Sequence, residues 1–132
     1  MQIQQICKPI QDKLQKHLLS SIPKVDQSHY QAAKYALSQG GKRLRPLLVL
    51  ITTQDFGGVM DQAYDAAAAL EYIHIYSLIH DDLPCMDDDD FRRGKPSVHK
   101  AFGEATAVLC GDYLMNQAFG LISDSEQLSA LQ

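Results

Sequence analysis

The sequence predicts an all-α fold, with residues 1–132 belonging to one domain. Apolar residues recur at spacings of three and four over most of the chain, which is the period of a helix with one buried face. No segment of useful length alternates apolar and polar residues, so we expect no β-structure. With 132 residues, 45% of them hydrophobic and 21% charged, the chain has the composition of an ordinary globular domain.

Helix-ending residues divide this periodic signal into five predicted helices. Pro23, the pair Gly40-Gly41 and the pair Gly57-Gly58 end the first three. Asp61 is the predicted N-cap of the fourth helix, which is apolar on nearly every side and is therefore central in a bundle. A polar loop is expected between the fourth and fifth helices, over residues 87–100. The predicted helices cover residues 3–22, 30–39, 46–56, 62–83 and 104–122.

Charge is concentrated in one region of the chain. The formal net charge is -4, and six of the sixteen acidic residues lie between Asp81 and Asp90. Cationic residues, among them Arg92 and Arg93, follow directly. A negative site beside a positive one suits a metal ion together with an anionic ligand. A nucleic-acid partner is not expected, because it requires a broad basic face.

Cysteine usage and hydropathy limit the compartment and the membrane relationship. Cys7, Cys85 and Cys110 lie far apart and form no CxxC pair, so the sequence predicts neither a zinc site nor a disulfide framework. A reducing, cytoplasmic location is the simplest interpretation. The N-terminus lacks the apolar core of a signal peptide, and no stretch of eighteen apolar residues occurs. We therefore expect no membrane span.

The aspartates that end the fourth predicted helix are candidate metal ligands. Asp81, Asp82 and Asp87 follow a strongly apolar segment, and hard carboxylate oxygens without cysteine partners suit Mg²⁺. Asp81 and Asp87 would lie on different faces of a straight helix, so we expect Pro84 to distort it and let them converge. A solvated acidic loop is the alternative. An EF-hand does not match, because Arg92 occupies the place of its glycine.

Two cationic motifs are candidate anion sites. GGKRLRP begins at Gly40, and backbone N–H groups at the following helix, with Lys42 and Arg45, would form a diphosphate cradle. It is not a P-loop, because neither the first glycine nor the Ser or Thr after the lysine is present. A helix-capping turn with solvated cations is the alternative. Arg92 and Arg93 either pair with the nearby aspartates or bind an anionic ligand.

Two histidines complete the set of candidate residues. The spacing of Glu71 and His74 is that of a di-iron motif, but no second copy exists. His80 followed by Asp81 resembles the doublet of metal-dependent phosphohydrolases, another all-α class, although the further ligands are not evident. For His74, a core histidine with a satisfied hydrogen bond remains the alternative.

Together these segments resemble the N-terminal half of short-chain trans-prenyltransferases, the farnesyl and geranylgeranyl diphosphate synthase family. The matching runs are GGKRLRP from Gly40, EYIHIYSLIHDDLPCMDDDDFRRGKPSVHKAFGEA from Glu71, and LCGD from Leu109. Three ordered motifs are far more specific than any one of them. The resemblance spans roughly residues 30–121 and implies the N-terminal portion of a helical isoprenoid-synthase bundle.

The resemblance also implies roles for individual residues. Asp81, Asp82 and Asp87 match the first aspartate-rich motif, which binds the Mg²⁺ ions that hold an allylic diphosphate (geranyl or dimethylallyl), and Arg92 matches an arginine that contacts that diphosphate. The implied reaction is head-to-tail condensation with isopentenyl diphosphate. The residues that match the isopentenyl diphosphate site are Lys42, Arg45, His74 and Arg93.

Product length is implied by the residues just before the first aspartate. Tyr76 lies five positions before Asp81, and Ser77 lies four. In the family an aromatic ring at this place closes the chain pocket, which favours a farnesyl product over a geranylgeranyl one. The alternative is that Tyr76 only packs in the core.

The family's second aspartate-rich motif and further helices have no counterpart here. We therefore expect a truncated prenyltransferase, impaired alone, whose exposed apolar faces favour a homo-oligomer such as a dimer. The alternatives are a non-catalytic Mg²⁺- and diphosphate-binding module, or a subunit completed by another chain. A His-Asp metal phosphohydrolase is a further alternative.

Overall fold

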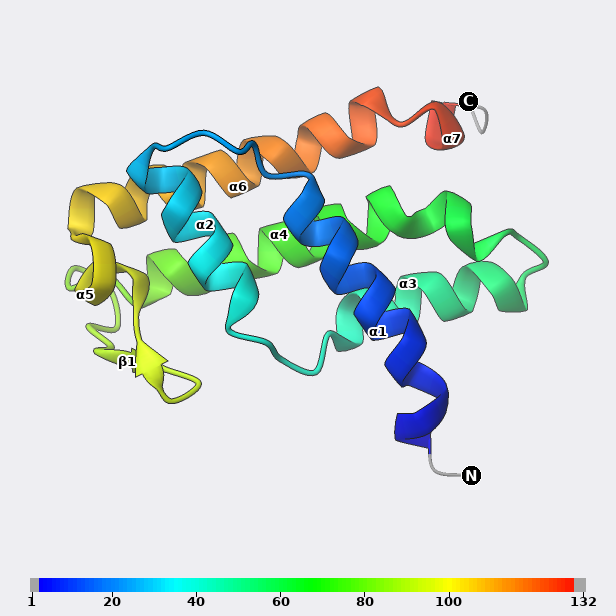
Figure 1. Ribbon diagram of the computed structural model, residues 1–132, viewed down its shortest axis with the longest axis horizontal. Helices are drawn as coiled ribbons and strands as arrows, with labels where there is room; N and C mark the ends of the chain where they lie inside the picture. Colours follow the sequence, from blue (N-terminus) through cyan, green and yellow to red (C-terminus); the bar gives the residue numbers. More distant parts are fainter. Residues whose placement is uncertain (1–2, 130–132) are drawn as a thin grey trace.

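The computed structural model describes residues 3–129, so Met1, Gln2 and residues 130–132 of the predicted domain lie outside the described residues. Helices dominate the described part, as the sequence predicts (Figure 1). The elements in chain order are α1 (Ile3–Ser20), α2 (Ser28–Ser38), α3 (Leu44–Asp55), the 3₁₀ helix η1 (Met60–Ala63), α4 (Tyr64–Asp81), the strands β1 (Phe91–Arg92) and β2 (Lys95–Pro96), α5 (Val98–Phe102), α6 (Glu104–Asp124) and α7 (Glu126–Ser129).

Helices α4 and α6 form the centre of the bundle. Small residues let them approach closely: Gly111 of α6 lies against the ring of His80, where a Cβ atom would collide. Leu114 and Cys110 of α6 are fully buried, and burial raises the pKa of the Cys110 thiol to about 12. The apolar fourth segment is therefore central, as its sequence predicts.

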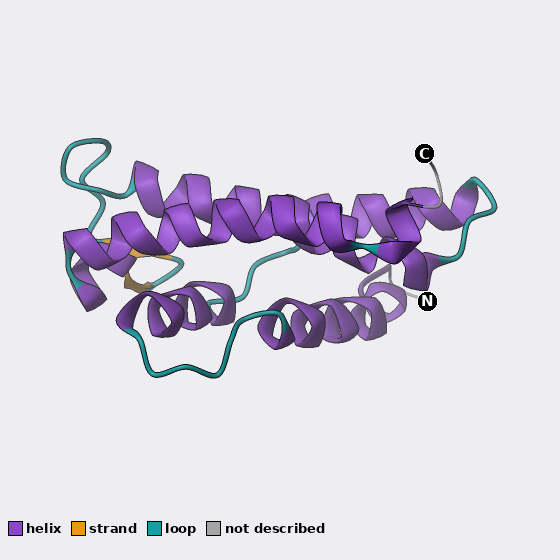
Figure 2. Ribbon diagram, turned by 90° about the horizontal axis from the view of Figure 1, so that it is seen from above, coloured by secondary structure: helices purple, strands orange, loops and turns teal. Residues whose placement is uncertain are grey.

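A second layer covers this pair. Helices α1 and α2 lie in front of α4 and α6 in Figure 1, and they form a separate layer when seen from above in Figure 2. Leu14 and Leu18 of α1 are fully buried against the core. The hydroxyl of buried Tyr72 in α4 donates a hydrogen bond of 2.6 Å to the carbonyl oxygen of Leu18, which fixes the two layers to each other.

The prediction of no β-structure is wrong at one place. Residues 91–96 form a two-stranded antiparallel hairpin in which Arg92 pairs with Lys95. Its two-residue turn consists of Arg93 and Gly94, with φ angles of 53° and 77°. Positive φ at both positions is typical of a type I′ turn, whose twist matches that of the strands. Strands of two residues are too short to give a periodic signal, and α5 follows within the predicted polar loop.

The predicted N-cap of the fourth helix is also wrong. Asp61 lies within η1, and α4 begins at Tyr64 without a side-chain cap. The carboxylate of Asp61 instead accepts a hydrogen bond of 2.6 Å from the Lys13 ammonium of α1. The acid therefore connects two elements that are distant in sequence, and it does not satisfy the N–H groups at the start of α4.

Several large apolar side chains are exposed. Among them, Leu48 of α3 and Phe119 of α6 are 64% and 67% exposed. Across residues 3–129, no helix combines the length and the apolar character needed to cross a membrane.

Candidate functional site

The glycine-rich loop between α2 and α3 is held in a left-handed conformation. Gly40, Gly41 and Arg43 have φ angles of 77°, 128° and 49°. The Arg93 guanidinium donates a hydrogen bond to the carbonyl oxygen of Gly40, and it occupies the place where a Cβ atom at position 41 would lie. A side chain at Gly41 would therefore displace Arg93, which explains why this position needs glycine.

A buried ion pair fixes the end of this loop. The Arg43 guanidinium lies 2.5 Å from the Glu71 carboxylate of α4, and the two residues are only 5% and 2% exposed. Arg43 also donates to the side-chain oxygen of Gln15 at 3.0 Å and to the carbonyl oxygen of Leu37. One arginine thus connects α1, the end of α2, the loop and α4.

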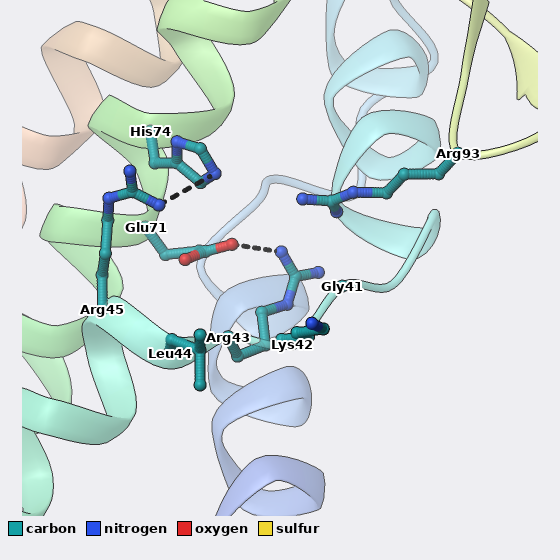
Figure 3. A pocket seen from close by; sticks show the side chains of 8 residues that line it. All are labelled: Gly41, Lys42, Arg43, Leu44, Arg45, Glu71, His74 and Arg93. Atoms are coloured by element: carbon teal, nitrogen blue, oxygen red, sulfur yellow. Dashed lines mark hydrogen bonds and ion pairs between the residues drawn. The ribbon is translucent and has the colours of Figure 1, made fainter.

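An open cleft of about 460 Å³ lies above this pair (Figure 3). Three cationic side chains converge on it, namely Lys42, Arg45 and Arg93, together with His74 of α4. The charges of the buried pair, Arg43 and Glu71, neutralise each other. The three other cationic side chains therefore give the cleft an excess of positive charge. Such a cleft can bind a compact polyanion through several charge-assisted hydrogen bonds.

His74 contributes an imidazole to the cleft. Its Nε2 atom lies 3.4 Å from the Arg45 guanidinium. Burial first, and then the charge of Arg45, lower the pKa of His74 below its ordinary value. The neutral imidazole is therefore favoured at neutral pH. The structure brings together the four residues that the family resemblance assigns to isopentenyl diphosphate. They are Lys42, Arg45, His74 and Arg93, and their role stays a prediction.

The aspartate-rich segment forms a tight turn after α4. The helix ends at Asp81, earlier than predicted, so Pro84 does not distort it from within. The backbone N–H of Asp87 donates to the carbonyl oxygen of Asp81 at 2.8 Å, which brings the two aspartates back together. The backbones of Asp81 and Asp87 are therefore brought together by ending the helix rather than by bending it, and the convergence of their carboxylates stays a prediction.

The second aspartate of the motif has a different environment. Asp82 is 2% exposed, and both of its carboxylate oxygens accept hydrogen bonds of 2.8 to 2.9 Å from Nε of Arg92. This bond with Asp82 raises the pKa of Arg92 above its ordinary value. In this structure Asp82 therefore positions Arg92, and its oxygens are engaged by the guanidinium.

Comparison with known proteins decides the family. The sequence profile of the family described as polyprenyl synthetase matches residues 26–132. The chain belongs to the polyprenyl synthetase family. The farnesyl diphosphate synthase of Bacillus subtilis (strain 168) is 57% identical over 98 residues, which are 73% of this chain and 33% of that protein. The chloroplastic geranylgeranyl pyrophosphate synthase of Capsicum annuum is 54% identical over 96 residues, 73% of this chain and 26% of that protein.

Solved structures of polyprenyl synthetase relatives agree with the fold. An FPP/GFPP synthase from Zymomonas mobilis superposes with a TM-score of 0.88 at 43% identity, over 95% of this chain and 46% of that chain. Geranyltranstransferase from Thermotoga maritima gives a TM-score of 0.82 at 45% identity, over 85% and 43%. The predicted all-α isoprenoid-synthase class is confirmed. The chain spans about a third of the length of the first curated relatives it matches.

The predicted chain-length residues of this chain lie one turn before the aspartates. Tyr76 is half-buried, and its ring packs edge-on against His80 with centroids 4.9 Å apart. The hydroxyl of Ser77 donates to the carbonyl oxygen of His74 at 2.9 Å. Both contacts lie within α4, so the role of Tyr76 in product length stays a prediction.

One cluster was missed by sequence reasoning. Within residues 3–129, the donor atoms of Asp88, Asp90 and His99 all lie within 4.8 Å of one another. Among the same residues the predicted ligands Asp81, Asp82 and Asp87 do not form such a cluster, and the Asp82 carboxylate is bonded to Arg92. Two aspartates at alternate positions and a histidine nine residues later are a weak signal, and only the hairpin brings them together.

Proposed function

We propose that the chain carries the diphosphate-binding part of a prenyltransferase site. The proposed reaction is the Mg²⁺-dependent head-to-tail condensation of isopentenyl diphosphate with geranyl or dimethylallyl diphosphate. The observation that carries the proposal is the cationic cleft, lined by Lys42, Arg45, His74 and Arg93, in a chain that also presents an aspartate-rich turn. Relatives named as farnesyl and geranylgeranyl diphosphate synthases support it.

The cleft is the proposed site of isopentenyl diphosphate. Lys42, Arg45 and Arg93 would hold its diphosphate by charge-assisted hydrogen bonds. His74 would gain a proton beside that anion, because the nearby negative charge favours the imidazolium form. Arg92 would bind the allylic diphosphate and stabilise the negative charge that develops on it as the carbon–oxygen bond breaks. The double bond of isopentenyl diphosphate would then form a carbon–carbon bond with the allylic carbon, and the condensed carbocation would lose a proton to the departed diphosphate or to water to give the longer product.

The carboxylates are the proposed magnesium ligands. Asp81 and Asp87 offer hard oxygen donors on one turn, which fits Mg²⁺, while Asp82 would join them only by releasing Arg92. When bound, Mg²⁺ would neutralise charge on the departing diphosphate. Arg92 is thus proposed to touch the reacting diphosphate directly, and Asp81, Asp82 and Asp87 to hold it through Mg²⁺.

Farnesyl diphosphate is the proposed product. The half-buried ring of Tyr76 in α4 supports this, because an aromatic ring can limit the depth of an apolar pocket. The test is Tyr76→Ala at the matching position of a full-length relative. A product longer than farnesyl, identified by mass spectrometry, supports the role, and an unchanged product assigns Tyr76 to core packing.

The partner and compartment are also proposals. The exposed Leu48 and Phe119 support a second copy of the chain as the partner, because exposed apolar side chains of this size favour association. Free cysteines at positions 7, 85 and 110 are compatible with the cytoplasm. Size-exclusion chromatography with light scattering tests the first point. A strictly monomeric chain contradicts self-association. A complex with a different, co-purified chain indicates a completing subunit.

A turnover assay tests the reaction. The 132-residue chain is given geranyl diphosphate, isopentenyl diphosphate and Mg²⁺, and the products are identified by mass spectrometry. Farnesyl diphosphate supports a catalytic chain. Binding without turnover favours the non-catalytic module or a subunit that needs another chain. Release of phosphate without a condensation product would support the phosphohydrolase alternative, against which the family membership stands.

Calorimetry tests the metal ligands separately. Asp81→Ala should weaken Mg²⁺-dependent binding of a geranyl diphosphate analogue by at least about tenfold, since even indirect disturbance of a metal ligand commonly has this effect. Asp124→Ala, at the exposed end of α6, is the matched control. Equal affinity of both variants would remove Asp81 from the proposed site.

A further inference from the structure

The missed cluster of Asp88, Asp90 and His99 has the composition of a metal site. Two carboxylates and one imidazole converge, with all donor atoms within 4.8 Å of one another. Asp88 has a left-handed backbone, with φ of 53°, and its N–H donates to the carbonyl oxygen of Leu83 at 3.1 Å. The backbone of the cluster is therefore fixed by contacts other than those among its acidic side chains.

Ser97 organises the other side of the cluster. This residue is 1% exposed, and its backbone N–H donates to the carbonyl oxygen of Asp90 at 2.9 Å. Its hydroxyl lies 3.0 Å from Nδ1 of His99, within hydrogen-bond distance. A hydrogen bond at one ring nitrogen orients an imidazole and leaves the other nitrogen to act as a ligand, as in many metal centres.

The other nitrogen of His99 lacks a partner. The residue is only 6% exposed, and its Nε2 atom is buried without a hydrogen bond to any of the described residues. A buried polar atom without a partner costs free energy, so native structures nearly always satisfy it. A cation shared with two nearby carboxylates would satisfy it here.

We propose that Asp88, Asp90 and His99 bind one borderline divalent cation, of which Zn²⁺ is the expected example. An imidazole with two carboxylates suits Zn²⁺ better than Mg²⁺, which prefers oxygen ligands and retains water. The site is distinct from the proposed magnesium ligands and does not depend on the proposed function. Lys100 lies 2.8 Å from one oxygen of Asp90, so the cation would use the other oxygen or displace the ammonium.

The position of the cluster gives the cation a structural consequence. Asp90 directly precedes the hairpin and His99 follows it, so the three ligands enclose residues 91–96. The hairpin carries Arg92 and its turn carries Arg93. A cation at this place would fix the base of the segment that supplies both arginines.

Titration of the 132-residue chain with Zn²⁺ tests the site. The Cys85→Ser variant serves as the parent, because Cys85 is exposed and its thiolate would compete. Excess Mg²⁺ occupies carboxylate-only sites. We expect one equivalent of Zn²⁺ in calorimetry and a shift of the His99 ring nitrogen resonance in NMR. No binding by the parent overturns the proposal.

Matched variants locate the binding. Asp88→Asn should weaken Zn²⁺ binding by at least about tenfold, whereas Asp89→Asn removes the same charge one position away and should leave it unchanged. Asp88 is exposed, so its substitution does not threaten folding as His99→Asn does. Equal weakening by both aspartate variants, or binding without a shift at His99, would overturn the assignment of these ligands.

Discussion

Glu71→Gln is the substitution that tests how the cationic cleft is supported. The amide keeps the shape of the carboxylate and one acceptor oxygen but removes its charge. Arg43, 5% exposed and 2.5 Å from Glu71, would then be a buried cation without a counter-ion. We expect the native state to lose stability because the desolvation of Arg43 is no longer offset.

The contacts of Arg43 set the size of this effect. Removing one partner of a buried ion pair costs about 3–5 kcal/mol. Arg43 would retain Gln15 at 3.0 Å and the carbonyl oxygen of Leu37 as acceptors, and the new side-chain amide still offers an oxygen. The loss should therefore fall near the lower end, about 3 kcal/mol. The double variant Arg43→Met/Glu71→Leu should be more stable than Glu71→Gln, because it leaves no buried charge.

Urea denaturation followed by circular dichroism measures the effect. The midpoint should fall at unchanged slope, which reports stability rather than a change in exposed surface. Glu104→Gln is the matched control, because Glu104 is exposed at the start of α6 and its loss should stay within about 0.5 kcal/mol. If Glu71→Gln and Glu104→Gln have the same midpoint, the buried pair does not support the cleft as argued.

Three further predictions concern other parts of the structure. Tyr72→Phe removes the hydroxyl that donates to Leu18 and should lower the free energy of unfolding by about 1 kcal/mol; an unchanged urea midpoint would contradict the contact. Leu114→Ala, at a fully buried position of α6, should cost about 2–5 kcal/mol in the same assay, and a much smaller loss would show that the core is loosely packed there. His74 should titrate by NMR with a pKa below its ordinary 6.5. The contribution of His74 to the free energy of unfolding is therefore complete above pH 6.5, the ordinary pKa of the unfolded chain. It is lost as the pH falls through the lower pKa of the folded state. Pyrophosphate should raise the pKa of His74. A pKa of 6.5 or above in the absence of pyrophosphate would contradict the environment described.

The sequence predicts those parts of the fold that local periodicity encodes. The long helices and the central place of α4 follow from apolar spacing, and the motif residues Lys42, Arg45 and His74 do line one cleft. The Arg43–Glu71 pair escapes prediction because its partners are separated by 28 residues and no local pattern marks them. The pairing of Asp82 with Arg92 escapes for a related reason: a run of aspartates does not reveal which one is buried.

The hairpin shows why the remaining geometry needed a structure. Arg92 and Arg93 are adjacent in sequence, yet Arg92 binds Asp82 beside the aspartate turn while Arg93 reaches the carbonyl oxygen of Gly40 beside the cleft (Figure 3). Successive side chains of a strand point to opposite faces, and the turn at Arg93 adds a left-handed backbone. A helix over these residues would have placed the two guanidinium groups only about 100° apart around one axis. The short hairpin therefore divides one pair of arginines between the two proposed diphosphate positions.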